Sequence, residues 1–462
     1  MKKFYTFFLF LTLLNAEDLS NLSKKELLDR INRLEKELNV LKEYVKKNVK
    51  EVHTKIKKID KRVDENEFES SLNRIKWGGE FITNISDYSG KTNAGTFHNH
   101  NKWDMQLRLN MEARINDKTK FTGRLMMSKA WGNSKGQSIS VLDALQGRAD
   151  GTSSLFVERA YIDYYVNKNF VVTVGRQPSS DGPGMSLKYD TPRKSTYPAL
   201  LFNGAADGIV LTYKYKNPYI PKCKLRFAYG KGYQWQDPLY GWSTVNPGIK
   251  DTDVYGVFVE GKIPVKGMGR NLFILTGVKT KHLVTDPFNN TNAVTNKDLG
   301  DYEHFGIYFE NLKAFNTKFN YFLSFAYALP EGNHNIGVAD LNNDGIPDTN
   351  VELLKKNGYA YHVGGRYDFK KIKLGYEFNH GSKYWFSFST NLYDPTNKLA
   401  IRGNVHDLYA IYKMDLYQYL RLGFVYADVN YNYTGMYFAP NGTPDRVNDK
   451  LKQYYMTYDV RW

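Results

Sequence analysis

The sequence is poor in cysteine and proline, and it has no long apolar run after its first residues. One cysteine, Cys223, and 15 prolines occur among 462 residues. A disulfide within the chain is therefore excluded, and we expect Cys223 to be a small apolar filler. No segment after residue 16 offers the roughly 18 consecutive apolar residues of a spanning helix. This absence excludes a bundle of membrane-spanning helices.

Acidic residues are also in deficit, whereas aromatic residues are abundant. The chain has 64 Lys and Arg against 48 Asp and Glu, a net charge of +16. Nucleic acid, anionic lipid and anionic solutes would all suit such a charge. The 36 tyrosines and 27 phenylalanines favour β-strands and are typical of membrane interfaces. The composition therefore predicts a β-rich protein that works at a membrane.

Residues 1–16, MKKFYTFFLFLTLLNA, have the pattern of a secretory signal peptide. Lys2 and Lys3 precede an apolar run from Phe4 to Leu14, and the small residue Ala16 follows. The run is about half of what a spanning helix needs, so an uncleaved anchor is the less favoured alternative. Because the chain is exported, we expect no nucleic acid as partner.

Residues 17–76 are predicted to form a coiled coil. Apolar residues recur there at steps of three and four, with one additional four-residue step that indicates a stutter. A seam this narrow suits a partner helix, although an amphipathic helix lying on a barrel or membrane remains an alternative. The seam does not distinguish a dimer from a trimer. Its residues are Leu27, Ile31, Leu34, Leu38, Leu41, Val45, Val49, Val52, Ile56, Ile59 and Val63.

At Trp77 the hydrophobic period changes from 3.5 to two, which marks a domain boundary. In residues 101–116, apolar side chains such as Leu107 alternate with polar ones such as Arg108. Lipid on one face and a wet lumen on the other explain this alternation. Sixteen such runs predict an all-β transmembrane barrel over 77–462, at 76–86, 102–116, 119–130, 156–167, 169–176, 207–216, 222–230, 253–263, 271–281, 302–312, 317–328, 358–369, 371–380, 404–415, 418–429 and 451–462.

Short and long connections alternate between these runs. Tight turns such as 116–118 and 167–169 alternate with long segments rich in Gly, Asn and Pro. Short periplasmic turns and longer outer loops are typical of outer-membrane barrels. We therefore expect both termini on the turn side, with the coiled coil in the periplasm, where it could contact the cell wall.

The last strand alternates Tyr454, Met456, Tyr458, Val460 and Trp462 with polar residues. Its aromatic end resembles that of bacterial outer-membrane proteins. The stretch VERAYIDYYVNKNFVVTVGRQPS at 157–179, together with the signal peptide, the coiled coil and the WGGEF start, resembles a porin-like family of epsilon-class proteobacteria of unknown function. The resemblance implies a homotrimeric porin in outer-membrane lipid, without known catalytic residues.

Charges of both signs fall on the face that the alternation turns towards the lumen. A ring of arginines in a narrow passage favours anions, so we expect a mild anion preference. Alternatively, pairs such as Arg108 with Glu112 or Arg159 with Asp163 hold the wall together. The residues predicted to line the pore are Arg108, Arg114, Arg124, Arg159, Arg176, Arg226, Arg366, Lys373, Asp163 and Glu112.

Two long loops carry features of their own. The loop 177–206, stiffened by four prolines, is a candidate for folding inward and narrowing the pore; an external loop without pore contact is the alternative. The loop 329–357 resembles a calcium loop, with alternating acidic or amide residues and a glycine. Val351 occupies position twelve, so we expect a non-standard site or an ordinary turn. The predicted ligands are Asp340, Asn342, Asp344, Ile346 through its carbonyl, and Asp348.

The sequence lacks the catalytic motifs that would indicate an enzyme. The histidines are scattered, and the sequence contains no nucleophile elbow, HExxH motif or phosphate-binding glycine loop. His98 and His100 could bind a metal, although a polar loop is the simpler explanation for them. We therefore predict a porin for small hydrophilic solutes with no required cofactor; the alternative is a structural or adhesive barrel with a blocked lumen.

Overall fold

The computed structural model describes most of the chain. The described residues are 24–72, 75–131, 155–178, 182–233, 250–265, 268–284, 298–333, 352–389, 394, 396–434, 439 and 442–462. The chain divides into two units at residue 74. Of the helices described, none is both long and apolar enough to cross a membrane.

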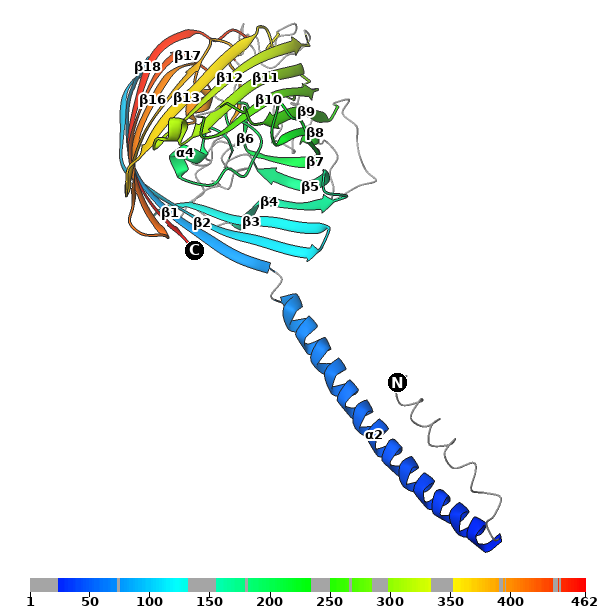
Figure 1. Ribbon diagram of the computed structural model, residues 1–462. Helices are drawn as coiled ribbons and strands as arrows, with labels where there is room; N and C mark the ends of the chain where they lie inside the picture. Colours follow the sequence, from blue (N-terminus) through cyan, green and yellow to red (C-terminus); the bar gives the residue numbers. More distant parts are fainter. Residues whose placement is uncertain are drawn as a thin grey trace, which may run out of the picture. The chain divides into compact units, whose positions relative to one another are not determined.

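The first unit is a single long helix, α2, which extends over Lys24–Leu72 (Figure 1). Its 49 residues include no glycine or proline, the two residues that most disfavour helix interiors. The apolar seam lies along its surface, and side chains such as Leu34 and Leu41 are more than half exposed in the single chain. The helix confirms the secondary structure expected for this region, and its partner stays a prediction.

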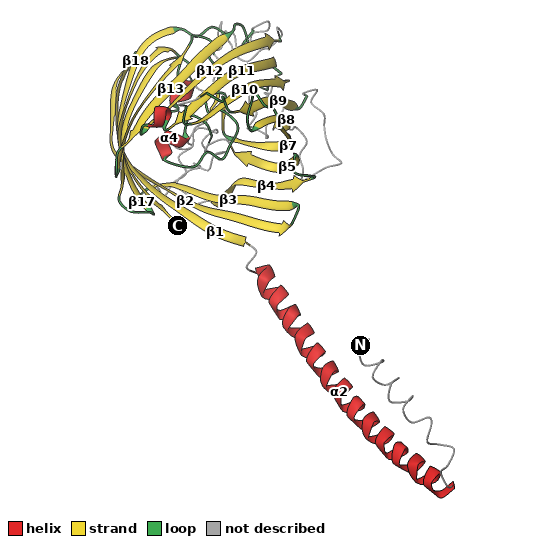
Figure 2. Ribbon diagram, in the orientation of Figure 1, coloured by secondary structure: helices red, strands yellow, loops and turns green. Residues whose placement is uncertain are grey.

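The second unit is a closed antiparallel barrel, and the described residues supply sixteen strands to it (Figure 2). β1 pairs with β18 and closes the ring, so no strand edge stays open. The strands are β1 (Ile75–Thr92), β2 (Gly95–Asn116), β3 (Thr119–Ala130), β4 (Leu155–Tyr165), β5 (Phe170–Pro178), β7 (Ala205–Tyr215), β8 (Cys223–Tyr233), β9 (Thr252–Gly261), β10 (Arg270–Lys281), β11 (Gly300–Leu312), β12 (Phe319–Gly332), β13 (Gly358–Asp368), β14 (Ile372–Gly381), β16 (Gly403–Lys413), β17 (Gln418–Tyr431) and β18 (Arg446–Arg461).

Each of the sixteen predicted strands is present, and the first hairpin is longer than expected. The prediction ended one strand at residue 86 and began the next at 102, whereas β1 and β2 continue to Thr92 and Gly95. A β-bulge lies between Ser86 and Tyr88, and Asn101 there has a positive φ of 57°. The bulge shifts the alternation by one residue, so the polar stretch beyond it did not look like a strand.

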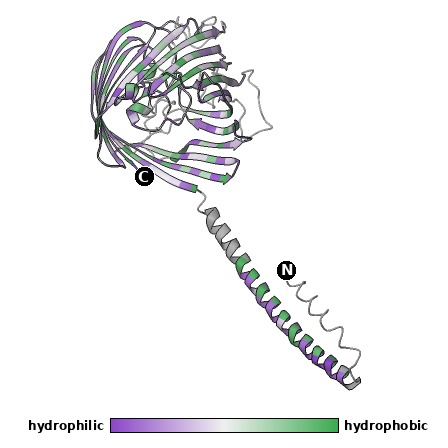
Figure 3. Cartoon of the chain, viewed as in Figure 1, coloured by the Kyte–Doolittle hydropathy of each residue, from purple (hydrophilic) through white to green (hydrophobic). Residues whose placement is uncertain are grey.

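Hydrophobic and hydrophilic residues alternate along the strands (Figure 3). On β12, Leu323 and Phe325 are 50% and 44% exposed, whereas the residues that alternate with them, Phe322, Ser324 and Ala326, are buried. Outward apolar side chains recur on neighbouring strands, for example Ile307 on β11. Such a face is costly in water and favourable in lipid.

Short turns and long connections alternate as the sequence predicts. The start of β1 and the end of β18 lie at the same end of the barrel, because Glu80 is paired with Arg461. The turn between β2 and β3, at 117–118, lies at this end too, since Ile75 is opposite Ala113. The long connections lie at the other end. Two of them return into the lumen.

Candidate pore constriction

The connection from β5 to β7 contains a short helix, α4 (Ser186–Tyr189), and a two-residue strand, β6 (Phe202–Asn203). Its side chains and backbone groups contact residues of β8, β9, β11, β13, β14, β16, β17 and β18. A segment can reach so many strands of a closed barrel only from the inside. Figure 1 shows α4 and β6 within the ring of strands. The inward fold considered for the loop 177–206 is thus what its described residues adopt.

Asp190 anchors the end of α4 to the barrel wall. It adopts a left-handed conformation, φ 51° and ψ 42°, where the helix ends. Its carboxylate accepts hydrogen bonds from Lys373 Nζ at 2.6 and 2.7 Å and from Arg366 Nη1 at 3.0 Å. Burial alone would raise the pKa of Asp190, but the charges of Arg366 and Lys373 outweigh it and hold the pKa below its usual value.

The carbonyl groups at the end of α4 are capped by arginines from the wall. Arg461 donates to the carbonyls of Tyr189 and Asp190 at 2.7 and 3.0 Å, and Arg421 donates to that of Lys188 at 3.2 Å. The last carbonyls of a helix have no partner within the helix. Cationic donors satisfy these groups and also complement the helix dipole.

A second ionic anchor joins α4 to β14 and β16. Lys188 Nζ lies 2.5 Å from Asp407 Oδ2, and Lys398 Nζ lies 2.6 Å from the same oxygen and 2.5 Å from Glu377 Oε2. All four side chains are at most 5% exposed. Burial would lower the pKa of Lys188, yet the charge of Asp407 raises it above the usual value. These ammonium groups therefore remain charged inside the barrel.

The connection from β14 to β16 also folds inward, a fold that was not among the predictions. It contains β15 (Phe388–Ser389) and a short 3₁₀ helix, η3 (Lys398–Ala400). β15 pairs in parallel with β6, so Phe388 is opposite Phe202. Trp385 is fully buried and donates its indole N–H to the carbonyl of Leu399 at 2.9 Å. The two inward segments thus pack against each other.

An apolar cluster fills the lumen between these segments and the wall of β11 to β13. Packing of large side chains there makes the inner structure a folded unit rather than a loose loop. A signal was present in the sequence, because the run Tyr-Trp-Phe-Ser-Phe at 384–388 is too apolar for a water-exposed loop. The cluster consists of Met185, Tyr189, Ala199, Leu200, Leu201, Leu283, Leu299, Tyr302, Ala326, Ala328, Leu353, Leu354, Ala360, Trp385, Phe386 and Leu399.

The structure brings three of the predicted pore-lining arginines together on β2 to β4. Arg108 Nη1 lies 2.5 Å from Glu80 Oε2, and Arg124 Nη1 lies 3.1 Å from Glu158 Oε2. Arg159 Nη2 lies 3.6 Å from the same Glu158 oxygen. The pairing partners differ from those considered in the sequence, because strand register rather than sequence spacing decides which side chains meet.

Three further residues that were predicted to line the pore contact the inward-folded connection from β5 to β7, the inner segment, or the residues that anchor it. Arg226 Nη1 donates to Thr196 Oγ1 and to Glu260 Oε2, both at 2.9 Å. Arg366 and Lys373 both bind Asp190, as described above. Thr196 in turn donates to Glu260 at 2.9 Å. These contacts fix the segment on the β8–β9 side as well as on the β13–β14 side.

The remaining predicted residues lie away from the constriction. Arg114 lies 3.4 Å from Asp117 at an exposed turn, and Glu112 pairs with Lys120 at 3.0 Å. Asp163 accepts a hydrogen bond from Thr173 at 2.6 Å. Arg176 forms a partly exposed pair with Asp207. The predicted calcium ligands, 340–348, lie outside the described residues.

A polar cavity of about 30 Å³ separates α4 from the wall of β1, β2, β17 and β18. This volume has room for water, and its lining offers several polar partners. Two of the residues at the edge of this cavity lie against each other: Arg421 Cζ lies 4.7 Å from the centre of the Tyr189 ring. The residues that line the cavity are Asn84, Ser86, Asp104, Gln106, Lys188, Tyr189, Asp394, Arg421, Gln453, Tyr455 and Thr457.

Several solved bacterial structures resemble this chain. OmpT of Vibrio cholerae is 12% identical, with 84% of this chain and 97% of that chain covered and a TM-score of 0.43. OprB of Pseudomonas putida, in its high-pH structure, is 11% identical over 86% and 96% of the two chains, with a TM-score of 0.48. OmpF of Salmonella typhi, in complex with daunomycin, is 12% identical over 84% and 97%, with a TM-score of 0.45.

Sequence comparison gives a family but no characterised relative. No protein of curated function matches this chain. The profile of one family covers residues 96–460, which includes nearly the whole barrel. The chain therefore belongs to the family described as "Protein of unknown function (DUF3373)".

Proposed function

We propose that the protein is an outer-membrane porin for passive diffusion of small hydrophilic solutes. The observation that carries this proposal is the segment with α4, which crosses the lumen and is held to the wall by ionic contacts. A segment fixed in this way narrows a channel without closing the barrel itself. The proposal assigns no catalytic role to the barrel.

The outer face of the barrel supports a membrane location. Apolar side chains such as Leu323 and Ile307 point outward on neighbouring strands. Outward aromatic residues accompany them near the barrel ends, among them Trp77 near the turns and Trp103 paired with Trp131 at 5.0 Å. Aromatic girdles around an apolar band are typical of outer-membrane barrels.

The charges in the lumen support a weak preference for anions. Arginines gather on one wall of the lumen, where Arg108, Arg124 and Arg159 each contact Glu80 or Glu158, and the chain as a whole carries a net charge of +16. Paired charges largely cancel each other's fields, whereas an excess charge in a narrow passage acts on the permeating ion. We infer that anions pass somewhat more easily than cations, with a modest rather than a strict selectivity.

The apolar cluster in the lumen favours a second candidate, a structural or adhesive barrel without a conducting path. Trp385, Leu399 and Ala326 are fully buried there, so at least this side of the lumen admits no solute. In that case the outer loops would bind a partner. Whether a path for ions exists along the β1–β4 wall separates the two candidates.

Single-channel recording in a planar bilayer tests the porin proposal. Purified full-length protein, shown to be folded by its shifted migration in an unheated gel, is added to one side of a membrane with a salt gradient. We expect discrete current steps with a reversal potential that favours anions. Folded protein that gives no steps would refute free diffusion and support the blocked barrel.

The proposal extends to assembly and to an outer loop. We infer that the chain forms a homotrimer in outer-membrane lipid, with residues 17–76 as a periplasmic coiled coil directed towards the cell wall. Current steps in groups of three would support the trimer. A calcium ion held by residues 340–348 would stiffen the outer loop, and calorimetric titration of calcium into the Asp344→Ala protein tests this site against the unchanged chain.

A further inference from the structure

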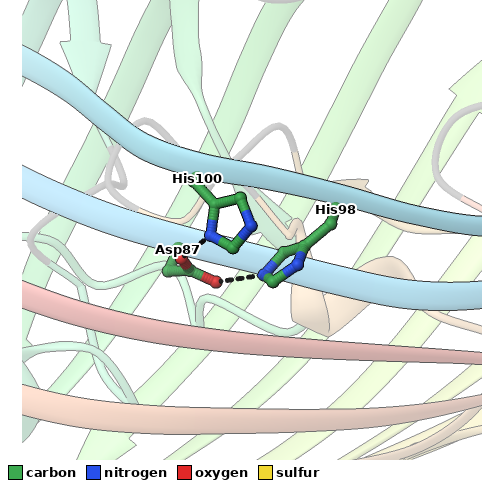
Figure 4. Close-up of side chains that lie close together, drawn as sticks. All are labelled: Asp87, His98 and His100. Carbon is green, nitrogen blue, oxygen red and sulfur yellow. Dashed lines mark hydrogen bonds and ion pairs between the residues drawn. The ribbon is translucent and has the colours of Figure 1, made fainter.

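The extended hairpin of β1 and β2 carries three metal-binding side chains that converge on one point. Figure 4 shows Asp87 of β1 between His98 and His100 of β2. His98 Nε2 lies 2.9 Å from Asp87 Oδ1, and His100 Nδ1 lies 2.8 Å from Asp87 Oδ2. Within the part of the chain that the structure describes, these three residues are the only such group, with ligand atoms within 4.8 Å of one another.

The strand pairing explains why these side chains meet. His98 and His100 are two residues apart on one strand and therefore point to the same face. The β-bulge between Ser86 and Tyr88 places Asp87 opposite the extra residue of β2, so that its carboxylate faces both imidazoles. The convergence is thus built into the backbone rather than produced by flexible side chains.

The cluster lies on the outer face of the barrel, beyond the apolar band. Ser86 and Tyr88 on either side of Asp87 are buried towards the interior, so Asp87 points outward. Ile85 pairs with Trp103, and Asp87 lies two residues further towards the loop end, or about 7 Å along the strand. The side chains of His98 and His100 are 48% and 64% exposed. A dissolved ion can therefore reach them.

The donor set matches a borderline divalent metal. Two imidazole nitrogens and one carboxylate oxygen are typical ligands of zinc and its neighbours, and three protein ligands leave a position for water. Donors around a tetrahedral zinc lie about 3.4 Å apart. The two imidazole nitrogens lie 2.9 and 2.8 Å from the carboxylate oxygens of Asp87, and all ligand atoms lie within 4.8 Å of one another, so small side-chain rotations suffice.

The arrangement of the rings also points to a cation. The imidazole centroids of His98 and His100 are only 3.3 Å apart. Imidazoles this close together can share one metal ion with the carboxylate between them. Each carboxylate oxygen of Asp87 contacts one imidazole, so the three side chains already converge in the way that a bound ion requires.

We propose that Asp87, His98 and His100 bind one divalent transition-metal ion of the zinc class at the outer end of the barrel. The three side chains provide one oxygen and two nitrogen ligands, and water completes the shell. The bound ion would link β1 to β2 beyond the membrane, where the hairpin has no other covalent or metal bridge among its described residues.

Metal titration of the full-length protein without an affinity tag tests the site. Zinc is titrated against a competing chromophoric chelator, for the unchanged protein and for the His98→Gln, His100→Gln and Asp87→Asn variants. We expect one zinc per chain, with an affinity at least about tenfold lower in each variant. The His282→Gln variant is the matched control, because the His282 imidazole contacts a single carboxylate, Asp298, at 2.8 Å. Its zinc affinity should equal that of the unchanged protein.

Cobalt provides a second readout that does not depend on affinity. Co²⁺ bound by two imidazoles and a carboxylate gives visible absorption bands that aqueous Co²⁺ lacks, and zinc should abolish them by displacement. The variants of Asp87, His98 and His100 lie on an exposed hairpin end, and the gel migration of the unheated barrel reports the folding of each variant and of the control. The proposal fails if folded protein binds no stoichiometric zinc, or if the histidine variants and the His282→Gln control bind it equally well.

Discussion

Lys373 of β14 holds Asp190 inside the barrel with its ammonium group 2.6 and 2.7 Å from the two carboxylate oxygens. Arg366 of β13 binds the same carboxylate. Asp190 is therefore the residue through which two adjacent wall strands hold the end of α4. Its substitution is the most direct way to release the inner segment.

We expect Asp190→Asn to raise the single-channel conductance and to make the open current noisier. The change removes the carboxylate that Lys373 binds, whereas Arg366 keeps its pair with Asp368 at 2.6 Å; loss of one partner of a buried pair costs up to about 3–5 kcal/mol. That cost falls on the docking of the segment, since the strand ladder does not involve Asp190. Planar-bilayer recording measures the effect.

Asp207→Asn is the matched control for this substitution. Asp207 pairs with Arg176, and both side chains are more than a third exposed, so the same chemical change should leave conductance unaltered. Equal conductance of the Asp190→Asn and unchanged proteins would contradict the role of Asp190 as an anchor.

A disulfide between the two inner segments tests their contact. Asn203 of β6 and Ser389 of β15 are paired residues of the parallel two-stranded sheet, and both are buried. Cysteines at these positions, with Cys223→Ser to remove the native thiol, should oxidise to a disulfide because paired strand residues lie within bonding reach. Mass spectrometry of the folded protein detects the link.

Oxidation should leave the conductance of this variant unchanged, since the contact already exists in the conducting state. A large change in current on oxidation would mean that the two segments separate when the channel conducts. Failure to form the disulfide in folded protein would contradict the inward fold of the β14–β16 connection. Serine at both positions provides the control without thiols.

The barrel could be predicted from the sequence because its signal is local and repeated. Each strand alternates over about ten residues, and β3 was predicted with its observed bounds, 119–130. The first hairpin was predicted too short, because the bulge at Asn101 shifts the alternation in 87–101. A period of two identifies strands only where no bulge interrupts it.

The constriction could be predicted only in part, because its contacts join distant segments. Prolines in 177–206 pointed to a stiff loop, but the pairing of β6 with β15 joins residues nearly two hundred positions apart. Likewise, Glu80 rather than Glu112 is the partner of Arg108. Such partners follow from strand register and loop docking, which a single sequence does not encode locally.

The ion pairs of α4 predict a conductance that is insensitive to pH around neutrality. The pKa of Asp190 is lowered, so its contribution to docking is present above its ordinary pKa of about 3.9 and is lost as the pH falls through the lower folded value. The pKa of Lys188 is raised, so its contribution is present below its ordinary pKa of about 10.4 and is lost only as the pH rises through the higher folded value.

Single-channel conductance should therefore be flat between about pH 5 and 9 and should rise only in stronger acid or base. Recording across this range at constant salt checks the expectation. A conductance that changes steeply between pH 5 and 7 would show that other groups control the opening. In Asp190→Asn, the rise in acid should disappear.

If the outer face of the barrel contacts lipid, an arginine placed on it should lower the free energy of unfolding by an amount that depends on its depth in the membrane. Leu323 lies outward in the middle of β12, where arginine in lipid costs about 2–4 kcal/mol. Phe315 is 68% exposed at a short turn, where the cost falls to about 0–1 kcal/mol. Urea unfolding in lipid vesicles should separate Leu323→Arg from Phe315→Arg by this margin. Equal losses would contradict a lipid-facing β12.

For the helix α2, we expect glutamate at two adjacent residues to have different effects on self-association. Leu41 belongs to the apolar seam, whereas Val40 does not, although both are well exposed in the single chain, 58% and 71%. In a coiled coil, Leu41 would be buried against partner helices, and glutamate there would place a charge in the seam. Leu41→Glu in the full-length protein should therefore weaken self-association, and Val40→Glu should not. Light scattering after chromatography, over a dilution series, measures the mass of the assembly. If both variants dissociate alike, or neither does, the seam does not join the chains, and the barrel alone must hold any trimer together.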